Sequence, residues 1–221
     1  MLFICLFLLI SLCPCLTFHF LFVTHVNELQ RVTNTAGICQ RNLPSDQITT
    51  LVWRGRGCND RMGDEIEALM RKHYTTYLVF TDKWSNAMPI SSLPFNSSST
   101  STSNLYIILD STWTEARNLY RKGPSILRNL PLLSIDDGGK STYTLRRNFG
   151  FVSKFTKSMG VDEDVGVRYL DRQIPVEHGL LCTAECVCRI LKHESRLVDA
   201  AKIMEELAYM QTQAQTRRKE K

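Results

Sequence analysis

Short, nearly continuous apolar runs alternate with amphipathic segments along this chain of 221 residues, and this alternation constrains the fold more than any other feature. A run without a polar residue at every second position is typical of a strand buried on both faces of a sheet. Strands that alternate with helices form mainly parallel sheets with helices on both faces. The sequence therefore predicts an α/β domain, with strands at residues 18–25, 49–53, 76–81, 104–110, 130–135 and 143–146.

Amphipathic segments that fit helices lie at residues 63–73, 111–122, 182–193 and 195–215. In the first of them, Asp64 is placed to cap a helix, and Glu67 follows three residues later. Ile66, Leu69 and Met70 then share one stripe, which we expect to face the sheet.

The first 23 residues carry no Asp, Glu, Lys or Arg. Such a segment is long enough for a membrane span or a signal, although Pro14 and His19 interrupt it. The alternative is an irregular N-terminus followed by a buried strand. Weaker patterns predict a Ser-rich loop and an insertion further on. The expected organisation is an irregular apolar segment at 1–17, a domain at 18–200 with a loop at 91–104 and an insertion at 149–179, and a C-terminal helix with a basic tail at 201–221.

Charge and cysteine content restrict the class of protein only mildly. The formal net charge of +5 permits a nucleic-acid partner without requiring one. The eight cysteines do not form the regular framework of a small secreted domain, and three of them, Cys182, Cys186 and Cys188, lie in a helical pattern. We therefore expect a reduced protein of the cytoplasm or nucleus, with membrane association possible through residues 1–23.

The most informative stretch is the one in which an apolar run ends at Asp110 and a helical pattern starts at Trp113. Ligands of open α/β sheets bind at the carboxyl ends of the strands, where Asp110 is expected. A purely structural explanation is also available: Thr112 and Glu115 fit a capping box, and Trp113 shares a helical face with core residues. The local pattern leaves both interpretations open.

Further polar signals lie elsewhere in the chain. Two arginines, Arg146 and Arg147, end a short predicted strand and are suited to a phosphate or a carboxylate. Thr183 and Glu185 fit the start of a helix, as cap and first-turn acid. Residues 31–37 form a polar, turn-rich loop before another helix.

Taken in order, these segments resemble the DTW-domain family. The resemblance rests on TNT at Thr33, Asn34 and Thr35, on D-S-T-W with E-A-R from Asp110 onward, and on C-T-A-E from Cys182 to Glu185. R-N-L-P and Y-T-L-R lie between the last two, and Ala36 stands where the family usually has Gly. The similarity extends over about residues 25–191.

The resemblance implies a SPOUT-like, knotted α/β fold and a tRNA-uridine aminocarboxypropyltransferase. Members use S-adenosylmethionine as co-substrate and place its 3-amino-3-carboxypropyl group on N3 of a uridine in tRNA. The catalytic residues it implies are Asp110, Thr112 and Trp113. Residues expected to contact the co-substrate are Ser111, Arg146, Thr183, Ala184, Glu185, Thr33, Asn34 and Thr35, and Arg54, Arg56, Arg61, Arg121, Lys122 and Arg128 are candidates for tRNA phosphates.

Family members often carry an N-terminal zinc site, and here its pattern is incomplete. Cys13 and Cys15 fit one half, Cys5 is wrongly spaced for the other, and His19 is a poorly patterned fourth ligand. We therefore expect no metal in the catalytic site and at most a degenerate zinc segment. An S-adenosylmethionine-dependent RNA methyltransferase and a catalytically inactive RNA-binding module remain as alternative functions.

Overall fold

The computed structural model describes residues 18–31, 34–73, 75–80, 86–93, 103–135, 141–142 and 181–219. Six strands form one sheet in the order β2-β1-β5-β3-β6-β4, and every neighbouring pair is parallel. This confirms the predicted α/β class with a parallel sheet. The strands are β1 (Phe18–His25), β2 (Ile48–Trp53), β3 (Thr75–Val79), β4 (Met88–Pro89), β5 (Asn104–Asp110) and β6 (Leu132–Ser134).

Five of the six predicted strands are confirmed, and β1 and β5 have the predicted bounds. The sixth, at 143–146, lies outside the described residues. Strand β4 was not predicted, because it has only two residues and one of them is a proline. A proline is tolerated at a sheet edge, which is where β4 lies.

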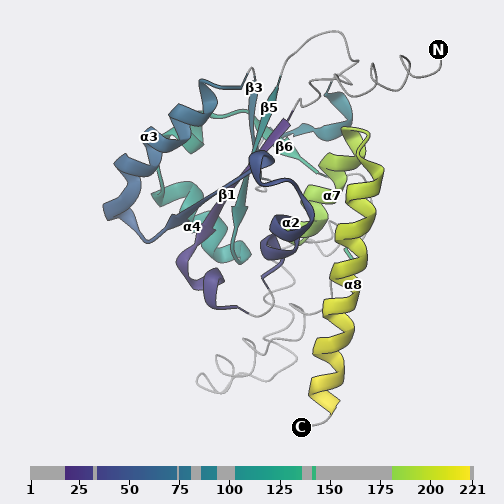
Figure 1. Ribbon diagram of the computed structural model, residues 1–221. Helices are drawn as coiled ribbons and strands as arrows, with labels where there is room; N and C mark the ends of the chain where they lie inside the picture. Colours follow the sequence, from purple (N-terminus) through teal and green to yellow (C-terminus); the bar gives the residue numbers. More distant parts are fainter. Residues whose placement is uncertain are drawn as a thin grey trace, which may run out of the picture.

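Helices cover both faces of the sheet, which explains why the strands are apolar throughout. Along β1 and β5, alternate side chains such as Phe20, Phe22 and Tyr106 face a core formed with α2, α7 and α8. The residues between them, such as Leu21 and Ile107, face a second core formed with α3 and α4. Figure 1 shows these two groups of helices on opposite sides of the sheet. Their bounds are α2 (Ala36–Asn42), α3 (Asn59–Met70), α4 (Trp113–Lys122), α7 (Thr183–His193) and α8 (Leu197–Lys219).

The connections of β1 and β5 leave the sheet in opposite directions. Strand β1 leads through α2 to β2 on one side, whereas β5 leads through α4 to β6 on the other, and these two helices cover opposite faces. This divergence is a topological switch point, and in open α/β sheets it opens a crevice at the carboxyl ends of the two strands. Short 3-10 turns complete the connections: η2 (Val26–Gln30), η3 (Ser45–Gln47), η4 (Arg56–Cys58), η5 (Ile90–Ser92) and η6 (Ser125–Asn129).

Two helix boundaries differ from the prediction by four residues. Helix α3 begins at Asn59, so Asp64 lies inside it and does not cap it. The earlier start places Met62 in the core, and the Asn59 side chain accepts a hydrogen bond from the Trp53 indole at 2.9 Å. Helix α8 continues to Lys219, beyond the predicted end at residue 215.

The structure describes only the last part of the apolar N-terminal segment, from residue 18 onward. Residues 18–23 belong to β1, which pairs with β2 on one side and β5 on the other, so they are not part of a membrane-spanning helix in this fold. No helix within the described ranges is long and apolar enough to cross a membrane. Residues 1–17 lie outside the described residues. So do residues 143–180, which belong to the connection from β6 to α7 and include the predicted insertion at 149–179. The implied knot therefore stays a prediction.

Candidate functional site

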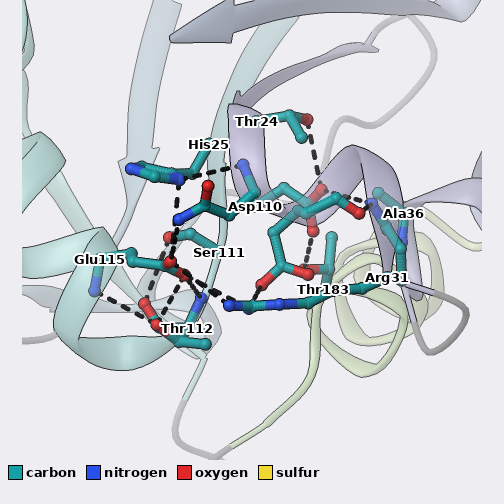
Figure 2. Close-up of polar contacts among 12 residues, drawn as sticks. Thr24, His25, Arg31, Ala36, Asp110, Ser111, Thr112, Glu115 and Thr183 are labelled. Atoms are coloured by element: carbon teal, nitrogen blue, oxygen red, sulfur yellow. Dashed lines mark hydrogen bonds and ion pairs between the residues drawn. The ribbon is translucent and has the colours of Figure 1, made fainter. Parts of the chain in front are cut away.

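Asp110 is the centre of a buried hydrogen-bond network at the switch point. Its side chain is 0% exposed at the end of β5. Oδ1 accepts a hydrogen bond from the Thr183 hydroxyl at 2.8 Å, and Oδ2 accepts from Thr24 at 3.2 Å and from the Asn34 amide at 3.3 Å. Figure 2 shows Thr24 and Thr183 approaching the Asp110 carboxylate from separate elements. The network fixes the orientation of Asp110.

Sheet register explains how Thr24 reaches Asp110. The two residues are direct neighbours at the carboxyl ends of β1 and β5, and both point to the α7 side of the sheet. Thr24 was not among the predicted site residues. The available signal was a hydroxyl near the end of an otherwise apolar run, but only the pairing of β1 with β5 gives that hydroxyl its partner.

The polar loop before α2 joins this network. Asn34 Oδ1 accepts a hydrogen bond from the Ala36 backbone at 2.8 Å, while its amide reaches Asp110. Thr35 is fully buried, and its hydroxyl accepts from the Ala184 backbone at 3.4 Å. Two of the three predicted loop residues therefore lie at the site, and the third, Thr33, lies outside the described residues.

The start of α7 differs from the prediction in one respect. Cys182, and not Thr183, is the N-cap residue, and it forms a capping box with Glu185. Because Thr183 is at the first helical position, its hydroxyl is not needed to cap the helix. It donates a hydrogen bond to Asp110 instead.

Glu185 is occupied by hydrogen bonds within the protein. It is buried and accepts from Ser141 at 2.7 Å, from the Thr142 backbone at 2.7 Å and from the Cys182 backbone at 2.9 Å. Burial alone would raise the pKa of Glu185, but these hydrogen bonds outweigh it and lower the pKa. Glu185 thus fixes residues 141–142 against α7. A direct contact of Glu185 with a co-substrate stays a prediction.

The D-x-T-W segment divides between the two sides of the sheet. Asp110 faces α7, whereas Thr112 caps α4 through the predicted capping box with Glu115, which is confirmed. Ser111 is buried, and its hydroxyl donates to the Thr112 carbonyl at 3.2 Å. Trp113 is half-buried and belongs to neither core cluster. The Trp113 indole is therefore not part of either hydrophobic core of the sheet.

Glu115 joins α4 to the segment after β1. It accepts hydrogen bonds from Asn27 at 3.0 Å and from Arg31 at 3.3 Å, in addition to its cap contacts with Thr112. Burial raises the pKa of Glu115, but the hydrogen bonds from Asn27 and Thr112 and the charge of Arg31 outweigh it, and the pKa falls to about 2. Arg31 also pairs with the buried Glu28. Arg31 and Asn27 were not predicted, because their shared partner Glu115 lies 84 and 88 residues further along the chain.

A pocket of about 380 Å³ opens beside Asp110 on the α2 side of the sheet. This size lies within the range of roughly 300–1,000 Å³ found for small-molecule sites. Among the described lining residues, Asp110 is the only carboxylate. The lining also includes the hydroxyls of Thr24 and Thr50, the amides of Asn34 and Gln40, the apolar side chains of Leu29 and Met210, and the guanidinium-bearing residues Arg31 and Arg41.

Arg146, which was predicted to contact the co-substrate, lies outside the described residues. The cysteines of the predicted zinc segment, Cys5, Cys13 and Cys15, also lie outside them. His19 belongs to β1, where its Nε2 lies 2.9 Å from the Thr49 hydroxyl. In the part of the chain that the structure describes, no group of three or more metal-ligating side chains is arranged to hold a metal ion. Zinc content stays a prediction.

Comparison with known protein families gives one match. The family model described as the DTW domain matches residues 4–149, which is well over half of the 221-residue chain. The matched region contains Asn34, Asp110 and Glu115 but ends before Thr183. No solved structure gives a significant match.

Proposed function

Because the chain belongs to the DTW-domain family, which is associated with tRNA modification, we propose that it transfers the 3-amino-3-carboxypropyl group of S-adenosylmethionine to N3 of a uridine in tRNA. The observation that carries this proposal is the meeting of three distant segments at one carboxylate. Asn34, Asp110 and Thr183 come from the T-N-T, D-x-T-W and C-T-A-E segments, and they are joined by hydrogen bonds beside a pocket.

The proposed reaction is a single displacement. Uridine N3 attacks the methylene carbon of the methionine chain that is bonded to the sulfonium sulfur. A bond from nitrogen to carbon forms, the bond from carbon to sulfur breaks, and methylthioadenosine leaves with the electron pair of that bond. The N3 proton passes to a base. Methyl transfer from the same donor would require attack on a different carbon, so the orientation of the donor selects the product.

The pocket lining suits this donor. A carboxylate matches an ammonium group, hydroxyls and amides match the polar edges of a nucleoside, and apolar side chains match the adenine face. Asp110 has two candidate tasks there: it accepts the N3 proton, or it binds the methionine ammonium. Trp113 is a candidate for stacking on adenine or uracil, and Arg146 for pairing with the methionine carboxylate or a tRNA phosphate.

The test is to incubate the protein with an unmodified tRNA transcript and S-adenosylmethionine, and to measure the masses of the nucleosides after digestion. We expect a uridine that carries the aminocarboxypropyl group, together with release of methylthioadenosine. A methylated nucleoside would instead identify an RNA methyltransferase. Bound but unchanged tRNA would identify an inactive RNA-binding module. Either of those results would overturn the proposal.

A further inference from the structure

Helix α4 has an exposed side without acidic residues. Its exposed positions are Thr114, Asn118, Arg121 and Lys122. The one acid of the helix, Glu115, is held in the capping box and by Arg31. A surface that offers hydrogen-bond donors and positive charge, with no carboxylate to repel an anion, is suited to a phosphate backbone.

The fold brings further cations to the end of this helix. Asn59 donates a hydrogen bond of 2.8 Å to the Lys122 carbonyl, which ties the start of α3 to the end of α4. Arg54 and Arg56 immediately precede α3 and are exposed. Arg128 contacts the same end of α4: its guanidinium donates hydrogen bonds to the carbonyls of Arg121 at 3.1 Å and Gly123 at 3.3 Å.

The neighbouring helix α3 differs from α4 because its exposed side carries acidic residues. Its exposed side includes Asp60, Asp64 and Glu67, and its exposed arginines form local ion pairs. Arg61 pairs with Glu65 at 3.0 Å, and Arg71, just after the helix, pairs with Glu67 at 3.7 Å. Both helices cover the same face of the sheet, so the difference between them divides that face into an anion-repelling part and an anion-accepting part (Figure 1).

We propose that the phosphate backbone of the RNA substrate lies along α4, on a surface that we call the α4 track: Thr114, Asn118, Arg121, Lys122, Arg54 and Arg56. This inference rests on the proposed function for the identity of the RNA. The ten residues of α4 extend for about 15 Å, and the helix begins three residues after Asp110. An RNA held on the α4 track therefore reaches the edge of the sheet at which the pocket opens.

The first experiment compares two double variants with the same loss of charge. Arg121→Ala with Lys122→Ala removes two cations from the α4 track, and Arg71→Ala with Lys72→Ala removes two exposed cations from the α3 side, just after that helix ends. Affinity for an unmodified tRNA transcript is measured over a salt series with each full-length protein. We expect the slope of log affinity against log salt to fall by about one unit for each phosphate that the α4 variant no longer binds, and to stay unchanged in the α3 variant.

The second experiment adds an acid in place of removing cations. Asn118→Glu places a carboxylate on the α4 track, and Ala68→Glu places one at an exposed position of α3. We expect Asn118→Glu to weaken tRNA binding by roughly threefold or more through repulsion of nearby phosphates, and Ala68→Glu to leave it unchanged. Both residues lie inside helices where Glu is well tolerated, so loss of folding does not explain a difference.

Equal loss of salt dependence in the two double variants would overturn the α4 track, since it would mean that only the net charge of the protein matters. A slope near zero in the parent protein would overturn it as well. Binding is measured without S-adenosylmethionine, so its outcome is independent of the nucleoside product. A track variant that loses tRNA binding, in a protein that makes no aminocarboxypropyl uridine, would support the surface and refute the reaction.

Discussion

Asp110 and Glu115 lie five residues apart in the chain, and their surroundings are very different. Asp110 faces the α7 side, is fully buried beside the pocket, and accepts from the neutral groups of Thr24, Asn34 and Thr183. Glu115 starts α4, keeps 18% of its side chain exposed, and accepts from the charged Arg31. Under the proposed function, the first carboxylate is held to meet a ligand. The second is held to join α4 to the segment after β1.

The largest effect is expected for Asp110→Asn. The amide oxygen can keep the contacts with Thr24 and Asn34, and the amide nitrogen can donate to the Thr183 hydroxyl, so the fold is retained while the charge is removed. We expect at least a hundredfold loss of transfer, on the order of the loss of one acid–base group. Asp64→Asn, the same change at an exposed position of α3, is the matched control and should leave turnover unchanged.

Calorimetry of S-adenosylmethionine binding to Asp110→Asn separates the two tasks proposed for this residue. Retained affinity with abolished turnover assigns proton transfer to Asp110, and abolished affinity assigns binding of the methionine ammonium. Near wild-type turnover would remove Asp110 from the mechanism.

A smaller effect is expected when a donor to Asp110 is removed. Thr183→Val deletes the hydroxyl that donates to Oδ1 at 2.8 Å and keeps the shape of the side chain. Loss of one hydrogen bond to a charged group corresponds to about 1.5–3 kcal/mol, so we expect turnover to fall by roughly tenfold or more. Thr183→Ser keeps the hydroxyl and should recover most of the activity. Equal turnover in the Val and Ser variants would contradict a positioning role.

Glu115→Gln is expected to affect stability more than chemistry. The folded-state pKa of Glu115 is lowered to about 2, so its ion pairs and hydrogen bonds stabilise the protein above the unfolded pKa of about 4.3. That contribution is lost as the pH falls toward the folded pKa. Urea unfolding between pH 7 and pH 3 should therefore show a less stable variant at pH 7, with a difference that shrinks below about pH 4.5. A difference that is independent of pH would contradict this role of the charge.

The smallest effect on activity is expected at the amino end of the same sheet. The rings of His19 and His73 lie 5.3 Å apart, and burial lowers the pKa of both; the charge of His19 further lowers that of His73. Because the folded state disfavours their charged forms, their stabilising contribution is present above the unfolded pKa of about 6.5 and is lost as the pH falls. In His73→Gln, the free energy of unfolding should fall less between pH 7 and pH 5 than in the parent protein, and turnover at pH 7 should be unchanged. A large loss of turnover would show that the two ends of the sheet are coupled.

The sequence by itself predicted those features that depend on neighbours along the chain. The apolar run that ends at Asp110 and the Thr112–Glu115 capping box are recognisable within a few residues, and both are confirmed. The predicted start of α3 was wrong because a tertiary contact of Asn59 and the burial of Met62 favour a longer helix than the local cap at Asp64 suggested.

Only the tertiary structure decided which groups surround Asp110. Thr24 lies 86 residues before it and Thr183 lies 73 residues after it, and neither position carries a local signal that names its partner. Their meeting depends on the order of the strands, which places β1 beside β5, and on the position of α7 against that pair. Strand order is a property of the whole sheet, since it is fixed by how all the crossovers pack on its two faces. The chain thus encodes the carboxylate locally, and its environment arises from the packing of elements that are distant in sequence.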